Sequence, residues 1–160
     1  MWFFMNACYI MSLLTILGLF IGFAQSFFHF PVVHANHVTF MIFVSILYAF
    51  TETLIIFFFV GTGVSIKEYT QQNSLDHSFH RQSIAVKRII YPPQMLNILF
   101  LIILFVMVGA VDTHRIPAWI YQTYFIFCIA DYLRNKVIQN KCFRENTKII
   151  LNMSGIKHGL

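Results

Sequence analysis

Long apolar runs separated by shorter polar stretches dominate the pattern of this chain. The runs cover about residues 5–28, 31–62, 94–111 and 117–133, and the main polar stretches cover 64–91 and 134–160. A helix needs roughly 17–25 predominantly apolar residues to cross the hydrocarbon core of a bilayer. The pattern therefore predicts an all-α integral membrane protein, a single membrane domain over residues 1–160 with four transmembrane helices in two hairpins.

The run at 31–62 is the longest, and local signals predict its ends. Pro31 suits the first turn of a helix, and Gly61-Thr-Gly63 is typical of a helix C-cap. A helix over Pro31–Gly61 would measure about 45 Å, against roughly 30 Å for a hydrocarbon core. We therefore expect its histidine-bearing start to project into the membrane interface.

The stretch at 64–91 is the most polar part of the chain before the tail. We expect a cytoplasmic loop here, with room for a short amphipathic helix near Ser83–Tyr91. The Pro92-Pro93 pair then favours the start of the third span at 94, because proline suits a helix start and not its interior.

Composition and charge support a membrane location. Hydrophobic residues make up 58% of the chain and charged residues 11%, which is too much apolar surface for a globule of 160 residues to bury. Ten of the eleven Lys and Arg residues fall in 64–91 and 134–160, and Arg115 is the exception. The positive-inside bias then predicts cytoplasmic termini, in a bacterial inner membrane or its organelle equivalent.

The same charge distribution bears on partners. The net charge of +5 sits in two blocks that flank apolar runs, so the sequence favours anionic lipid headgroups as its partner and not nucleic acid. Other membrane-protein subunits, or a second copy of the chain, are the further expected partners. The cysteines Cys8, Cys128 and Cys142 form no disulfide framework.

Histidines gather where the predicted topology brings two connections to one side of the membrane. His29, His34 and His37 precede or open the second run, and Asp112 and His114 lie between the third and fourth. His34 and His37 would share a helix face, a spacing that suits a zinc or copper ion, and helix-end histidines also hold haem b. The alternative is that each ring simply sits at the interface, where its amphipathic character is favourable.

Glu52 is the only charged residue before Lys67, and it lies deep inside an apolar run. An acid in a membrane helix is a candidate functional group. On a continuous helix it would share a face with His34 and Tyr48, a polar path suited to proton relay. The alternative is a protonated side chain that hydrogen-bonds a neighbouring helix and fixes packing.

Three functions remain open from the sequence. The first is an accessory subunit of a larger membrane complex, respiratory or redox, without chemistry of its own. The second is a redox protein that binds haem b, copper or zinc through His29, His34, His37 and His114, with Asp112 as a further metal ligand and Glu52 and Tyr48 relaying protons. The third is a small proton-coupled transporter that uses Glu52. No H-E-x-x-H, G-x-S-x-G or Walker motif supports hydrolysis or nucleotide use.

Overall fold

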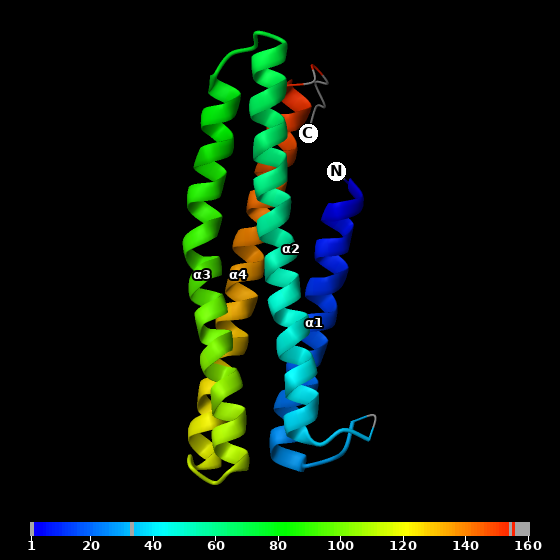
Figure 1. The fold of residues 1–160 in the computed structure, drawn as a ribbon, viewed down its shortest axis with the longest axis vertical. Coiled ribbons are helices and arrows are strands. Elements are labelled where there is room, and N and C mark those ends of the chain that lie inside the picture. Colours follow the sequence, from blue (N-terminus) through cyan, green and yellow to red (C-terminus); the bar gives the residue numbers. More distant parts are fainter. Residues whose placement is uncertain (1, 33, 154, 156–160) are drawn as a thin grey trace.

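The chain folds into a bundle of long antiparallel helices. The computed structural model describes residues 2–32, 34–153 and 155. Its helices are α1 (Trp2–Phe28), α2 (His37–Gln72), α3 (Ser78–Asp112) and α4 (Ala118–Met153). They run alternately down and up, so both described chain ends point towards the end with the 73–77 turn, although α1 begins well short of it. The 29–36 and 113–117 loops lie together at the other end (Figure 1). The all-α prediction is confirmed for the described residues.

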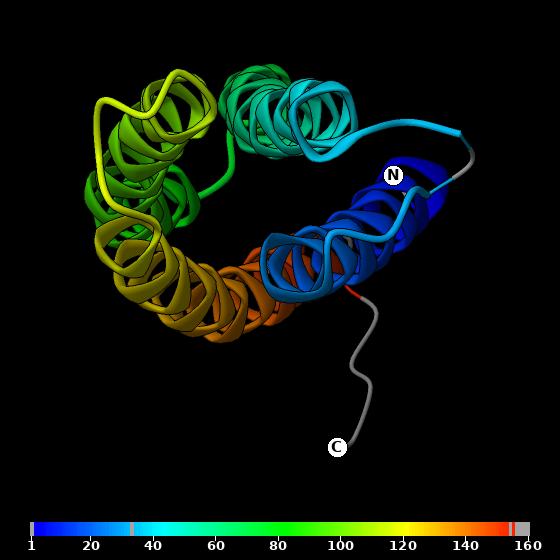
Figure 2. The same ribbon diagram turned by 90° about the horizontal axis from the view of Figure 1, so that it is seen from below.

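Seen along the bundle, each helix packs against its neighbours in a ring. Contacts join α1 to α2, α2 to α3, α3 to α4, and α4 back to α1 (Figure 2). Three helices, α1, α2 and α3, are long and apolar enough to cross a membrane. The fourth, α4, is long enough, but it has an apolar first half and a charged second half. It is therefore not among the helices that are apolar enough to cross a membrane.

The helices continue through most of the polar stretches, which corrects the predicted loop at 64–91. Only the turn at 73–77 interrupts helix there, and α4 carries the basic stretch as helix to Met153. The rest of the predicted tail, apart from residue 155, lies outside the described residues. Gly61-Thr-Gly63 is mid-helix and no C-cap, because Ile66 and Thr70 remain buried beyond it. Long polar stretches become helix here because one face of each still packs on a neighbour.

Prolines do not mark the helix starts that the sequence indicated. Pro92 and Pro93 lie inside α3, between Ile90 and Gln94, which are both fully buried. Packing on either side of the prolines therefore outweighs their local preference. Pro31 likewise starts no helix, because α2 begins at His37 and its N-cap is Asn36, whose side chain accepts a hydrogen bond from the Thr39 amide at 3.0 Å.

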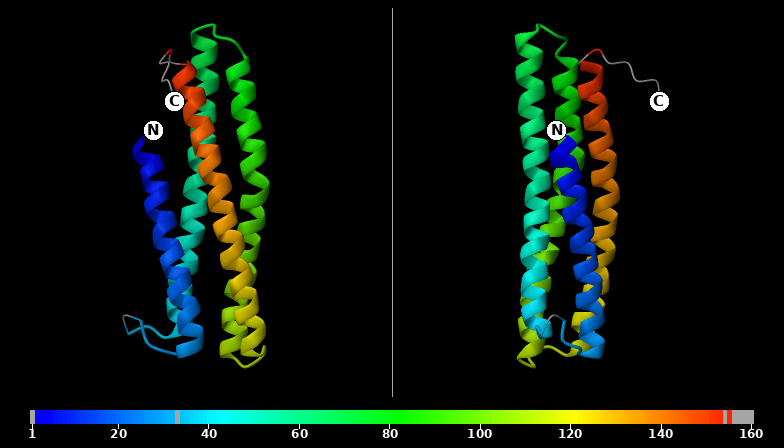
Figure 3. Two further views of the ribbon diagram at one scale, coloured as in Figure 1. Left: turned by 180° about the vertical axis from the view of Figure 1, so that it is seen from behind. Right: turned by 90° about the vertical axis from the view of Figure 1, so that its right-hand side faces the viewer.

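Each helix buries a stripe with alternating spacings of three and four residues. In α4 this stripe is Cys128, Tyr132, Asn135, Gln139, Cys142, Asn146 and Ile149. In α3 it includes Gln94, Asn97, Leu101, Leu104 and Val108. A mean spacing of 3.5 residues is the pattern of left-handed coiled-coil packing, which explains the near-parallel alignment of the helices (Figure 3).

Two apolar clusters fill the bundle, one towards each end. The cluster near the 29–36 loop includes Leu19, Met41, Leu104 and Phe125. The cluster near the 73–77 turn includes Phe58, Ile66, Ile90 and Phe143. Where the two clusters meet, many of the buried positions are polar.

Candidate functional site: a polar layer inside the bundle

Polar side chains, most of them buried, gather where the two apolar clusters meet, and all four helices contribute to them. We call this set the polar layer; its members are Ser12, Thr15, Tyr48, Thr51, Glu52, Gln94, Asn97, Asp131, Tyr132, Asn135, Lys136 and Gln139. Most of these lie on the buried stripes. They are therefore held in place by the same packing that forms the bundle.

Glu52 lies at the centre of the layer and is fully buried. Its Oε1 is 2.6 Å from the ammonium of Lys136, and its Oε2 accepts a hydrogen bond from Gln139 Nε2 at 2.7 Å. Lys136 also donates to Gln139 Oε1 at 2.8 Å, which closes a three-membered ring of contacts. Both oxygens of Glu52 accept, as those of a carboxylate do. The geometry is that of a salt bridge in which Glu52 is fully buried and Lys136 is 14% exposed.

Two further contacts hold this ring in the bundle. Gln94 on α3 donates to the backbone carbonyl of Glu52 at 2.8 Å. The Lys136 ammonium lies 4.5 Å from the centre of the Tyr132 ring, within the range of a cation–π contact. The contacts among Glu52, Lys136 and Gln139 thereby connect α2, α3 and α4.

A second branch of the layer runs from Tyr48 towards the surface of α4. The Tyr48 hydroxyl donates to Asn97 Oδ1 at 2.6 Å, and Asn97 Nδ2 donates to Asp131 Oδ2 at 2.9 Å. Asp131 also lies 3.4 Å from Arg134, whose side chain is exposed. Tyr48 therefore bonds to Asn97 in this structure, and the two branches meet where the Tyr48 and Tyr132 rings stack edge to face.

The first helix joins the layer through hydroxyl groups. The hydroxyls of Thr15 on α1 and Thr51 on α2 lie 2.9 Å apart. Tyr132 on α4 donates to the backbone carbonyl of Ser12 at 3.4 Å. A hollow of about 210 Å³ between α1 and α4, lined in part by Ser12, Lys136 and Gln139, reaches this side of the layer. Lys136 therefore faces this hollow at the side of the bundle, whereas Glu52 is not among the residues that line it.

The candidate histidines gather at the opposite end from the charged half of α4. His29, His37, Asp112 and His114 line a hollow of about 630 Å³, and His34 lines a neighbouring hollow of about 360 Å³ with His29, His37 and Asp112. His37 Nε2 lies 2.9 Å from the Tyr121 hydroxyl. Among the described residues, however, no group of three His, Cys, Asp or Glu side chains is placed to hold a metal ion.

His34 does not share a helix face with His37 or Glu52, so that prediction is wrong. It precedes the N-cap of α2, in a turn with φ of +64°. The short Val32–Ala35 bridge and two hydrogen bonds from Gln25, to the carbonyls of Phe30 and Ala35, fix this loop. The continuous polar face from His34 to Glu52 is therefore interrupted at its start.

His29 and His114 have a backbone role that the sequence did not indicate. Each has a left-handed backbone, with φ of +50° and +56°, at the position just after a helix where glycine is common. The His114 amide donates to the Val111 carbonyl and the Arg115 amide to the Ala110 carbonyl, which is the Schellman arrangement. Histidine tolerates this conformation better than most residues. Both histidines therefore end helices, whatever else they do.

Sequence reasoning placed Lys136 in a tail and gave Gln94, Asn97 and Gln139 no role. Their spacing could have indicated a role. Gln94 and Asn97 are three residues apart, as are Lys136 and Gln139, and each pair continues a helical pattern of apolar residues. Polar residues on an apolar stripe indicate interhelical hydrogen bonds.

No protein family, no curated protein and no solved structure matches the chain. The class of protein therefore rests on the fold alone. It is an all-helical bundle in which three long apolar helices indicate a membrane protein.

Proposed function

We propose that the chain is a four-span membrane protein that serves as an accessory subunit of a larger membrane complex. The fourth span is α4, which runs the length of the bundle between α1 and α3 (Figure 2). Its first half exposes Trp119, Ile126 and Phe127, which are 67%, 55% and 50% accessible. If α1, α2 and α3 cross a bilayer, α4 beside them crosses it too.

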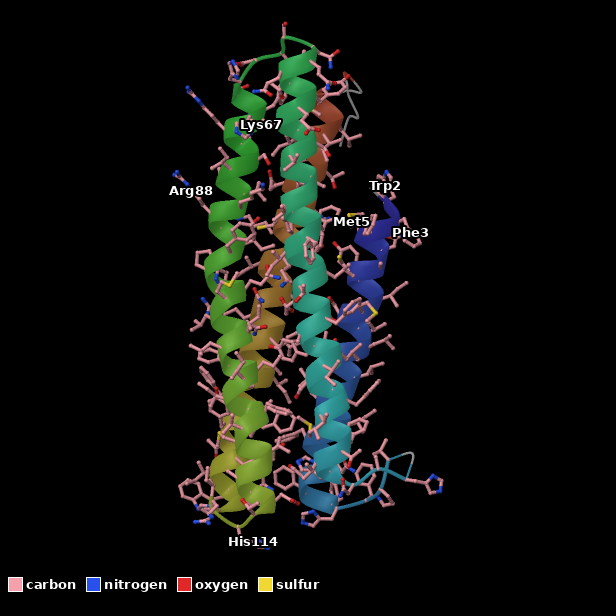
Figure 4. The ribbon with its side chains drawn as sticks, in the orientation of Figure 1. Trp2, Phe3, Met5, Lys67, Arg88 and His114 are labelled. Atoms are coloured by element: carbon pink, nitrogen blue, oxygen red, sulfur yellow. The ribbon has the colours of Figure 1, made fainter. Side chains whose placement is uncertain are left out.

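Charge supports an orientation with the chain ends in the cytoplasm. Arg115 is the only Lys or Arg at the end formed by the 29–36 and 113–117 loops. Lys67 and Arg88 lie towards the opposite end from His114 (Figure 4), as do Lys141, Arg144 and Lys148 in the second half of α4. This asymmetry follows the positive-inside bias.

The observation that carries the accessory role is the closed ring of Glu52, Lys136 and Gln139. The two charged side chains of this ring bind each other, and their contacts join α2 to α4 within the same chain. Ion pairs of this kind set which helices meet and in which register. The chain then presents to its surroundings mainly apolar helix faces, the surface that a membrane-embedded partner or lipid requires.

The test compares assembly with proton flux. The tagged chain is solubilised from its own membranes in mild detergent, and native mass spectrometry measures the complex. The same protein in pyranine-loaded vesicles reports proton flux under a potassium diffusion potential. We expect a stoichiometric membrane partner and no flux above that of empty vesicles. A monomer without partners, whose flux disappears in Glu52→Gln, would establish the transporter instead.

The histidine end supports a second candidate, a haem b or metal site. His37 Nδ1 is buried without a hydrogen-bond partner among the described contacts, and His29, His114 and Asp112 line the same hollow. Imidazole nitrogens are the ligands that haem iron, copper and zinc accept. Redox chemistry would then be contributed by the bound group.

A visible spectrum, oxidised and then reduced with dithionite, together with metal analysis, tests this second candidate. A Soret band that shifts on reduction, or about one metal ion per chain that is lost in His37→Ala, would support it. A colourless and metal-free protein, purified with its partners attached, would exclude it.

A further inference from the structure

A groove lies between the N-terminal half of α1 and the C-terminal half of α4, outside the polar layer. It encloses about 710 Å³. Trp2, Met5 and Tyr9 line its α1 wall, and Lys141, Arg144 and Lys148 line its α4 wall. Figure 4 shows Trp2 and Met5 at the N-terminal end of α1. The α1 wall is therefore aromatic and apolar, and the α4 wall carries three cations beside apolar residues such as Val137 and Phe143.

The cationic wall keeps a net positive charge after its internal pairing. Lys141, Arg144 and Lys148 are exposed, and Glu145 is the one acid among the lining residues. Glu145 lies 3.4 Å from Lys148, with both side chains about half exposed. Two cations against no acid remain, which suits an anionic group.

The depth of the groove matches the lipid headgroup region. Tyr9 is 19 residues from the Phe28 end of α1, or about 28 Å, and Lys141 is 23 residues from Ala118, or about 35 Å. A hydrocarbon core is about 30 Å thick, and the bilayer with its headgroups about 40–45 Å. With the 29–36 and 113–117 loops at one interface, the three cations extend through the headgroup region of the other, from Lys141 at about 35 Å to Lys148 at about 45 Å.

An apolar stripe continues from the groove towards the membrane centre. Val137 forms part of the groove and is 71% exposed, and Leu133 and Ile126 follow at helical spacing on α4. On α1, Leu13 and Leu17 continue in the same way from Tyr9 and are exposed. The surface below the cations can therefore accept an acyl chain along its length.

We propose that this groove binds one anionic phospholipid. Its phosphate contacts Lys141, Arg144 and Lys148, its glycerol region lies against Trp2 and Tyr9, and one acyl chain follows the stripe through Val137. The inference rests on the four-span orientation proposed above and not on the accessory role. The bound lipid would lie between α1 and α4 at the point where α1 is apolar and α4 is charged.

Native mass spectrometry with added lipid tests the site. Dioleoyl phosphatidylglycerol and dioleoyl phosphatidylcholine are titrated separately into the detergent-solubilised protein, so that only the headgroup differs. We expect tighter binding of phosphatidylglycerol, and a loss of about tenfold or more in the variant Lys141→Gln/Arg144→Gln/Lys148→Gln. The matched control is Lys67→Gln/Arg81→Gln/Arg88→Gln, which removes the same charge from exposed positions on α2 and α3 and should bind as the parent does.

A second measurement locates the lipid. In a Trp119→Phe background, Trp2 is the only tryptophan. Brominated phosphatidylglycerol should quench Trp2 fluorescence more strongly than brominated phosphatidylcholine at equal mole fraction, and the difference should vanish in the groove variant. Equal binding of the two lipids, or equal losses in the groove and control variants, would overturn the proposal. Neither result would affect the copurification test of the accessory role.

Discussion

Lys136 on α4 reaches Glu52 on α2 with a distance of 2.6 Å between Nζ and Oε1, although 84 residues separate the two in the chain. The contact lies between two apolar clusters, where a single unpaired charge would be strongly unfavourable. It fixes the register of α2 and α4 across the bundle, although the two helices are not neighbours in the ring, because sliding one helix by a turn would separate the two charges.

Removing one partner of the pair should destabilise the protein more than removing both. Glu52→Gln leaves the Lys136 ammonium without its counter-ion, and Lys136→Met leaves the Glu52 carboxylate with Gln139 alone. Each should lower the free energy of unfolding by about 3–5 kcal/mol, nearer the lower value because Lys136 is 14% exposed. The double variant should recover much of the loss, as a denaturant titration in detergent would measure. Additive losses in the double variant would mean that the two residues act independently.

Asn97 should contribute to the stability of the bundle because its side chain hydrogen-bonds to two polar groups at once. Asn97→Leu leaves the Tyr48 hydroxyl and one Asp131 oxygen without their partner, with an expected loss of about 1–3 kcal/mol. Adding Tyr48→Phe removes one of the orphaned groups, so the double variant should lose less than the sum of the singles. Thermal unfolding of the four proteins gives the comparison, and strict additivity would contradict the hydrogen bond.

Gly18 permits close contact between α1 and α2. A Cβ atom at Gly18 would lie 3.1 Å from Val44 Cγ2, so Gly18→Leu should overpack the interface and cost about 1–3 kcal/mol. Gly109→Leu is the control, because a Cβ there meets nothing within 4 Å. Thermal stability in detergent should fall only for Gly18→Leu, and Val44→Ala should restore part of it. Equal effects at the two glycines would point to helix propensity and not to packing.

Cysteine labelling with a membrane-impermeant maleimide tests the four-span topology. Cys8, Cys128 and Cys142 are buried, so they give a low background. Pro31→Cys should react from outside intact cells, whereas Gln72→Cys and Asn152→Cys should react only after permeabilisation. Reaction of Asn152→Cys from outside would mean that α4 does not cross.

The turn at 73–77 supplies a pH-dependent contact outside the membrane spans. Hydrogen bonds from Ser78 hold the pKa of Asp76 below its ordinary value of 3.8, and the Ser78 amide donates to Asp76 Oδ1 at 3.0 Å. The stabilisation is complete above pH 3.8 and is lost as the pH falls through the lower folded pKa. Carboxyl NMR should give a midpoint below 3.8 that rises in Ser78→Ala and stays in Gln82→Ala. An unchanged midpoint in Ser78→Ala would contradict the contact.

The sequence by itself determined the all-helical class, the membrane-type composition and the gathering of His29, His37, Asp112 and His114 at one end. Each follows from local or additive properties: run length sets helix and membrane preference, and antiparallel connections bring alternate loops together. Helix ends were less predictable. The local sequence predicted a helix end at Gly61 and Gly63 and a helix start after Pro92-Pro93. Both helices continue through these positions because the residues on either side pack in the bundle.

Only the tertiary structure decided which side chains are the partners of Glu52. From the sequence it was an isolated acid beside Tyr48 and His34; in the bundle its partners are Lys136 and Gln139, and His34 lies outside the helix. A charge in an apolar run must find a partner, but the linear pattern does not say which, because partner choice depends on how helices align across the bundle. Lys136 becomes the partner because α4 remains helical past Asp131 and brings the Lys136 side chain to the level of Glu52.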